Sequence, residues 1–341
     1  MAAFRSTSRT FAAVPVVATA SGTRPVQAGS AAQPGQTVGL PVGARLPVGL
    51  YFVNLSSFGT RSTRPRDSST NVNLPTLAWA TPWDVAGARL QVFFTQPVAA
   101  ASSQGAAYQS GIGQQLLAAQ LAWDFGGDVG VSYLFGGYLP IQTRFLTQSA
   151  SLTHRFAASC TGQDWNLTAN LLYGVFLDTR SPSGTLYPDY LNLDLTMTRK
   201  FGKWQVGAVA YGSSDLPTGV ASYRPQGQVA VGGLVGYNFG PVNLQAYLTR
   251  DVVERGYRGR EVRGWLRAIV PLYQDASEVE PNRTLVTRRQ AEEPAQASDV
   301  SGWGQGDAGC RSRRFEFPSQ AVAEAVLLRP HQAWDQEEIA K

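Results

Sequence analysis

The sequence predicts an all-β protein, a closed antiparallel up-and-down transmembrane β-barrel of about 12 strands with disordered N- and C-terminal segments. Three observations predict it. Apolar residues alternate with polar or small ones over segments of about ten residues, long and short connections alternate between those segments, and aromatic residues lie near the segment ends. Charged residues make up only 16% of the chain, and no run of about 18 apolar residues follows the amino terminus, so a membrane-spanning helix is not expected.

The alternation is clearest between Trp165 and Tyr273. Every odd position from Trp165 to Leu177 is apolar, and most of the positions between them are polar or small. A period of two is the signature of a strand with one apolar face, because successive side chains point to opposite sides. No part of this region repeats at helical spacing. The predicted strands are 48–58, 72–80, 88–98, 115–125, 129–139, 150–159, 165–177, 190–199, 204–212, 228–239, 242–249 and 262–273.

The connections between these strands are sorted by length. Short ones are expected at 81–87, 126–128, 160–164, 200–203 and 240–241, and long ones at 59–71, 99–114, 140–149, 178–189, 213–227 and 250–261. Long and short connections alternate along the chain. This pattern is typical of an outer-membrane barrel with tight periplasmic turns and longer outer loops.

The cost of charge in hydrocarbon predicts which face meets lipid. An exposed charged side chain at mid-membrane costs about 2–4 kcal/mol, so the apolar positions are expected to face outward. The residues expected to line the lumen are then Arg89, Gln91, Arg155, Asn166, Asn170, Asn192, Asp194, Asn243, Gln245, Arg263 and Arg267, with Gln205 also expected to point inward. A soluble barrel would show the reverse arrangement, and periodicity alone leaves it open. The loop asymmetry and the aromatic residues near strand ends favour the membrane.

The two ends of the chain differ from the middle. Residues 1–28 form a candidate signal peptide with small-residue cleavage sites after Ala20 and Ala28, and a disordered alanine-rich leader is the alternative. Residues 29–47 are interpreted as an extended leader without structure of its own, and 48–273 as the barrel. Residues 274–341 hold 12 of the 24 acidic residues and lose the alternation. We interpret them as a disordered tail, either periplasmic or the product of a shifted reading frame.

The sequence gives little support for catalysis, cofactor binding or nucleic-acid binding. The barrel region contains one histidine, His154, on the apolar parity, without a nucleophile or acid set around it. No glycine-rich phosphate loop precedes a helix, and neither a metal site nor a cofactor is expected. The net charge of +5 comes mostly from arginines without a compact basic patch, so nucleic acid is not an expected partner. The protein is therefore not expected to be an enzyme.

Several short motifs resemble a known family. They are LAWATP at 77–82, LAWDFG at 121–126, YLP at 138–140, WNLTAN at 165–170, DLT at 194–196, GYNFG at 236–240 and VPL at 270–272. Together they resemble the transporter-like outer-membrane barrel family named for the meta-pathway of phenol degradation, over about 48–273. The resemblance implies a location in the outer membrane, a gene beside those for aromatic degradation, and no catalytic residues.

Two functional classes remain from the sequence. The first is a passive channel or transporter for small solutes, aromatic or hydrophobic ones included, whose partners are outer-membrane lipid and the solute. An inward-folded loop or the leader would narrow the lumen of such a barrel. The second is a structural or adhesive surface barrel that acts through its long outer loops. A soluble binding barrel ranks third.

Overall fold

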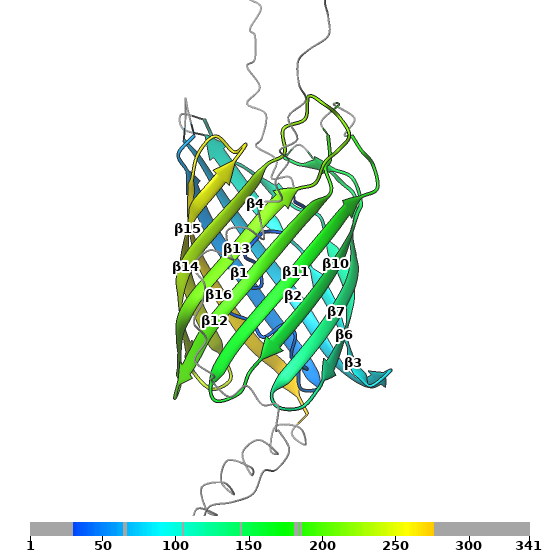
Figure 1. Cartoon of the computed structure of the whole chain (residues 1–341), viewed down its shortest axis with the longest axis vertical. Coiled ribbons are helices and arrows are strands. Elements are labelled where there is room, and N and C mark those ends of the chain that lie inside the picture. The colour runs from blue at the N-terminus through cyan, green and yellow to red at the C-terminus, as the bar shows by residue number, and fades with distance from the viewer. Residues whose placement is uncertain are drawn as a thin grey trace, which may run out of the picture.

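The protein folds into one closed β-barrel (Figure 1). The computed structural model describes residues 30–275 apart from 64–66, 104–105, 144, 181–183 and 185. The candidate signal peptide at 1–28 and all but the first two residues of the tail predicted at 274–341 lie outside the described residues. In the described part of the chain, no helix has the length and apolar character that crossing a membrane requires.

Within the described residues, sixteen strands form two sheets, a large one and a two-stranded one. Their bounds are β1 Gly49–Arg61, β2 Ser68–Val85, β3 Ala88–Thr95, β4 Val98–Ser103, β5 Gln109–Ile112, β6 Leu116–Asp124, β7 Val129–Tyr138, β8 Ile141–Gln142, β9 Thr147–Gln148, β10 Ser151–Cys160, β11 Trp165–Phe176, β12 Tyr190–Phe201, β13 Trp204–Asp215, β14 Gly227–Asn238, β15 Asn243–Arg255 and β16 Glu261–Gln274.

The large sheet closes because β1 pairs antiparallel with both β2 and β16. Of the fourteen strands in this sheet, β4 and β5 extend sideways from the first half of β2, which leaves 12 in the closed ring. The predicted 12-strand barrel is confirmed. The strands are hydrogen-bonded in chain order, so every backbone polar group in the ring can find a partner without an open edge.

Several strands run further than the sequence indicates, mainly at the end that carries the long connections. β2, β13 and β15 continue into 68–71, 213–215 and 250–255, which the sequence assigns to loops. The predicted long loop at 99–114 contains most of β4 and all of β5, and β8 with β9 forms a small hairpin in the loop at 140–149. Polar residues in these extensions hide the alternation, because both faces meet water or other polar groups above the membrane.

The alternating side chains are sorted by face. Along β11, Trp165, Leu167 and Leu171 are exposed on the outside, whereas Asn166 and Asn170 are buried inside. Aromatic side chains gather near the short-turn end of the strands; they are Trp79, Trp83, Trp123, Trp165, Trp204, Tyr237 and Tyr273. An apolar outer band with an aromatic girdle is the surface that a lipid bilayer requires.

The first prediction concerns this outer band. Leu171 faces outward near the middle of β11, between Phe156 and Leu193 of the neighbouring strands. Leu171→Arg should lower the free energy of unfolding in lipid vesicles by about 2–4 kcal/mol, because its charge meets hydrocarbon. Phe201→Arg, at the short-turn end of β12, should cost about 0–1 kcal/mol because it meets the interface. Urea titration of both variants measures the difference, and equal costs would contradict a lipid-facing Leu171.

Candidate functional site

Residues 30–48, here called the luminal segment, run through the inside of the barrel (dark blue trace in Figure 1). The segment begins beside Tyr190 and Asn192, at the long-loop end, and leads into β1 at the short-turn end. Hydrogen bonds Gln36 N to Gln33 O, Leu40 N to Thr37 O and Ala44 N to Pro41 O make it a series of turns. It is therefore not the extended leader without structure that the sequence indicates for 29–47.

A carboxylate of the wall binds the amide side of this segment. The Oδ1 atom of Asp194 accepts a hydrogen bond from Gly35 N at 2.9 Å. Its Oδ2 atom accepts bonds from Thr37 N at 2.9 Å and Thr37 Oγ1 at 2.6 Å. Gly35 has a φ of 83°, which favours glycine over other residues. Hydrogen bonds to a charged group are stronger than neutral ones, so Asp194 is a principal anchor of the segment.

A guanidinium binds the carbonyl side. Arg267, completely buried, donates from Nη1 to Val38 O at 2.6 Å and from Nη2 to Gln36 O at 2.7 Å. Its Nη1 atom also donates to Gln245 Oε1 at 2.8 Å. The amides of the luminal segment thus meet a negative group and its carbonyls a positive one.

Amide side chains from three strands converge on one carbonyl of the segment. Asn166, Gln205 and Gln245 each donate to Gly39 O, at 3.2, 3.4 and 3.1 Å. Gly39 N in turn donates to Thr196 Oγ1 at 2.7 Å. Because β11, β12, β13 and β15 all take part, the segment is held from a wide arc of the wall.

The last part of the segment is tied to the opposite side of the barrel. Val42 O accepts hydrogen bonds from Ser132 Oγ at 2.8 Å and Gln120 Nε2 at 3.3 Å, and Gly43 N donates to Ser159 Oγ at 2.9 Å. Arg45 pairs with Asp84 at 2.7 Å where β2 approaches its turn. The luminal segment therefore crosses the lumen from the long-loop end to the short-turn end, with hydrogen bonds to strands along its way.

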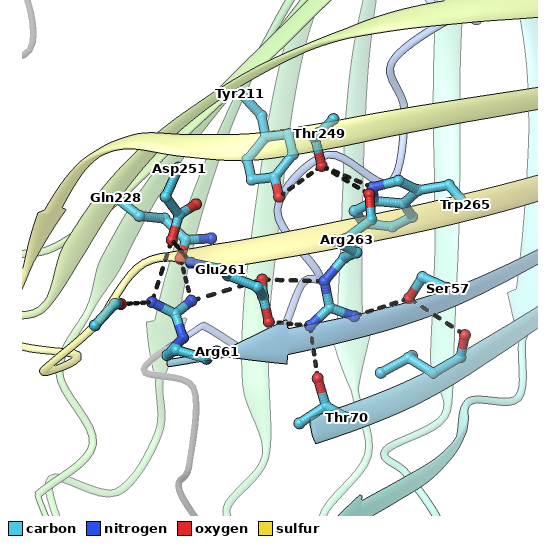
Figure 2. A network of polar contacts seen from close by, with 12 residues as sticks. Ser57, Arg61, Thr70, Tyr211, Gln228, Thr249, Asp251, Glu261, Arg263 and Trp265 are labelled. Atoms are coloured by element: carbon cyan, nitrogen blue, oxygen red, sulfur yellow. Dashed lines mark hydrogen bonds and ion pairs between the residues drawn. The ribbon is translucent and has the colours of Figure 1, made fainter. Parts of the chain in front are cut away.

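A second polar cluster joins the first and last strands near the long-loop end (Figure 2). Arg263 Nη2 lies 2.7 Å from Glu261 Oε1, and Arg61 Nη1 lies 3.2 Å from Asp251 Oδ2. Arg61 also pairs with Glu261 at 3.6 Å. We call these four residues the rim network. Its two arginines and two acids balance in charge and link β1, β15 and β16 where the barrel closes.

An open cavity of about 650 Å³ runs beside the luminal segment, from Leu46 and Tyr51 to the rim network. Its walls come from the luminal segment and mainly from β1, β2, β3, β6 and β7, together with parts of the connection between β3 and β6. Many of the lining side chains are apolar; they include Leu55, Leu74, Phe93, Leu116, Leu134, Tyr138 and Phe145. This cavity has the size and apolar lining typical of small-molecule sites.

The structure gives each residue expected in the lumen a definite place. Gln91, Arg155, Asn170, Arg263 and Arg267 line the cavity. Asn166, Asn192, Asp194 and Gln245 contact the luminal segment rather than open space, and Asn170 and Arg267 do both. Arg89 is buried and donates to Leu46 O at 3.3 Å, whereas Asn243 is only partly buried, near the short-turn end of β15.

Sequence reasoning missed the residues that complete these contacts. Thr196 and Tyr247 bind the luminal segment from the wall, and Phe93 and Leu134 are apolar yet face inward. Gln205, by contrast, was expected on the inner face and donates to Gly39 O there. Thr196 and Tyr247 share the parity of Asp194 and Gln245, so alternation could have found them. The inward apolar residues break the rule that apolar side chains face lipid, and no local pattern marks them.

The described residues show no assembled chemistry of another kind. Among them, no group of three or more His, Cys, Asp and Glu side chains could hold a metal ion. His154 lies on the outer parity of β10, where its Nδ1 atom is 2.8 Å from the hydroxyl of Tyr133. This histidine belongs to an aromatic cluster with Phe135 and Tyr173 on the outside of the barrel.

The closed ring, its apolar exterior and its polar interior define an outer-membrane β-barrel. Residues 34–268 match the family model described as "Putative MetA-pathway of phenol degradation", and the chain belongs to that family. The resemblance inferred from the motifs is confirmed, and so is the location in the outer membrane. Among curated proteins, none matches the chain by sequence.

Solved structures share the fold. An outer membrane channel from Pseudomonas putida F1 superposes with a TM-score of 0.56 at 17% identity, covering 70% of this chain and 99% of that one. The β domain of the Bordetella autotransporter BrkA matches at a TM-score of 0.41 and 14% identity, over 65% of this chain and 99% of the other. The first of these supports the barrel architecture.

The second prediction tests the anchor of the luminal segment. Asp194→Ala leaves three donors without their charged acceptor, a loss of about 1.5–3 kcal/mol for each hydrogen bond to a charge. Amide hydrogen exchange at Gly35 and Thr37 should therefore speed up at least tenfold, as measured by mass spectrometry on the folded barrel. Asp178→Ala, which removes an exposed contact with Ser149, is the control. Unchanged exchange in Asp194→Ala would show that other contacts hold the segment.

Proposed function

We propose that the protein is a passive outer-membrane channel that admits small hydrophobic or aromatic solutes and performs no catalysis. The observation that carries this proposal is the cavity of about 650 Å³ beside the luminal segment. A solute from outside meets apolar side chains such as Leu74, Phe93 and Leu116 there. Burial of apolar surface favours aromatic molecules by about 25 cal/mol per Å² removed from water.

The presence of the luminal segment in the lumen supports selectivity against ions and sugars. The luminal segment is bonded to wall residues on β6, β7, β10, β11, β12, β13, β15 and β16. The segment thereby restricts a hydrated ion to the space beside it, in contrast to the barrels of 16–18 strands that leave an open channel. For a solute to continue to the short-turn end along the barrel axis, the luminal segment has to shift.

The polar wall residues fit the same proposal. We propose that a passage opens when the luminal segment shifts, and that polar wall residues line it. These residues are Arg89, Gln91, Arg155, Asn166, Asn170, Asn192, Asp194, Asn243, Gln245, Arg263 and Arg267. Each would then exchange a hydrogen bond with the segment for one with water. The proposal also includes an export signal at residues 1–28 and a Gram-negative source. An outer-membrane barrel has to be exported across the inner membrane, which a signal peptide directs.

The third prediction compares two neighbouring phenylalanines of β3. Phe93 lines the cavity, whereas Phe94 is exposed on the outside of the barrel. Phe93→Ser should slow the uptake of toluene into proteoliposomes about tenfold, because the change removes apolar contact along the route. Phe94→Ser should leave uptake close to that of the wild type.

Two outcomes would count against the proposal. Equal uptake by both variants and the wild type would show that the cavity is not on the route. No uptake above that of protein-free vesicles would favour a barrel that acts only through its outer loops. Heat-modifiability on a gel confirms that each variant is folded before uptake is measured.

A further inference from the structure

The charged side chains around the cavity are unequal in sign. Of those in the described residues that line it, Arg61, Arg155, Arg263 and Arg267 are positive, and only Glu261 is negative. Charges that are removed from bulk water interact strongly, because the surrounding dielectric constant is low. The cavity therefore favours an anion over a cation of the same size.

Three of the four arginines already have strong partners. Arg61 and Arg263 are paired with Glu261, and Arg61 is also paired with Asp251. Arg267 donates to Val38 O, Gln36 O and Gln245 Oε1. Their guanidinium groups serve the rim network and the luminal segment, so they are poorly placed to bind a solute.

Arg155 differs from the other three. It lies in the middle of β10 and is partly exposed to the cavity, with no hydrogen bond or ion pair to any described residue. Its Nε atom is buried and without a partner. The carboxylate of Asp194, on the same side of the barrel, already accepts three hydrogen bonds from Gly35 and Thr37. A guanidinium kept out of bulk water without a direct ion pair is a binding group for a carboxylate.

The neighbours of Arg155 suit an aromatic body. Leu134 of β7 and Leu172 of β11 lie directly opposite Arg155 in the sheet, and both are buried. Further along the same row, Leu134 pairs with Gln120 of β6, and Gln120 with Gln91 of β3. Gln91 Nε2 is a second buried donor without a partner, and it also lines the cavity. An apolar surface between two free donors matches a molecule with a greasy centre and acceptor oxygens.

We propose that Arg155 is a binding residue for the carboxylate of small aromatic acids, whose ring lies against Leu134 and the apolar wall of the cavity. This inference rests on the proposed function and narrows its solute class from hydrophobic molecules in general to amphipathic aromatic anions. Arg155 can hold the carboxylate with two parallel N–H donors, a geometry that lysine does not offer.

The experiment compares a carboxylate with a neutral molecule of similar shape. The fluorescent probes 2-naphthoate and 2-naphthalenemethanol are titrated onto the folded full-length protein in detergent. The wild type should bind 2-naphthoate at least tenfold more tightly than the alcohol. Arg155→Gln should abolish this preference while leaving binding of the alcohol within about twofold, and Arg155→Lys should retain part of it. Arg199→Gln, which removes the same charge from the exposed outer face, should behave as the wild type.

The outcomes separate this inference from the proposed function. Equal affinities of the two probes in the wild type, or a preference that survives Arg155→Gln, would overturn the role of Arg155 while leaving a channel for neutral solutes intact. Failure of both probes to bind, together with no toluene uptake by proteoliposomes, would overturn both. Should Arg155→Gln fail the heat-modifiability test, Arg155→Lys and the wild-type comparison of the two probes still decide the matter.

Discussion

The need to satisfy buried polar groups determines how this barrel is built inside. A ring of 12 strands that faces lipid on the outside places polar side chains in a narrow interior, where an unpaired group costs several kcal/mol. The luminal segment supplies many of the missing partners from its own backbone. Asp194 accepts hydrogen bonds from its amides, and Arg267 donates to its carbonyls. The side chains of Asn166, Gln205 and Gln245 all donate to the carbonyl oxygen of Gly39.

This arrangement gives the lumen two unlike sides. Along β11, β12, β13, β15 and β16, the wall holds the luminal segment through many hydrogen bonds. Along β2 and β3, inward apolar residues such as Leu74 and Phe93 replace the amides, and space remains open beside the segment. A hydrogen-bonded segment can have alternative partners in water, whereas an apolar wall attracts apolar solutes. The two sides are therefore suited to different tasks, closure on one and solute capture on the other.

The charged side chains inside the barrel are arranged in two different ways. The rim network balances Arg61 and Arg263 with Asp251 and Glu261 where the first strand meets the last, so it stabilises closure of the ring without adding net charge. Deeper in the lumen the charges do not pair directly. Asp194 and Arg267 are each hydrogen-bonded to peptide groups of the luminal segment, whereas Arg155 lines the cavity. Among the described charged residues that line the open space, four are arginines and one is a glutamate.

The sequence by itself determined the barrel. Alternation along β11 to β16, the sorted connections and the aromatic strand ends are local features, and each follows from the cost of exposing the wrong group to lipid. They located every strand of the ring, although β2 and β15 run well past the predicted ends, and put Asp194, Gln245 and Arg267 on the inner face. The sequence did not predict the strand ends that extend beyond the membrane, because the polar residues there do not alternate with apolar ones.

Only the tertiary structure decided what fills the lumen. Residues 30–48 have no periodic pattern, and their role depends on amides and carbonyls meeting wall residues more than 100 positions away, as Gly35 meets Asp194 and Val38 meets Arg267. The inward position of Phe93 and Leu134 likewise follows from the space that the luminal segment leaves unfilled. Such choices depend on distances across the barrel, and a linear sequence records none of them.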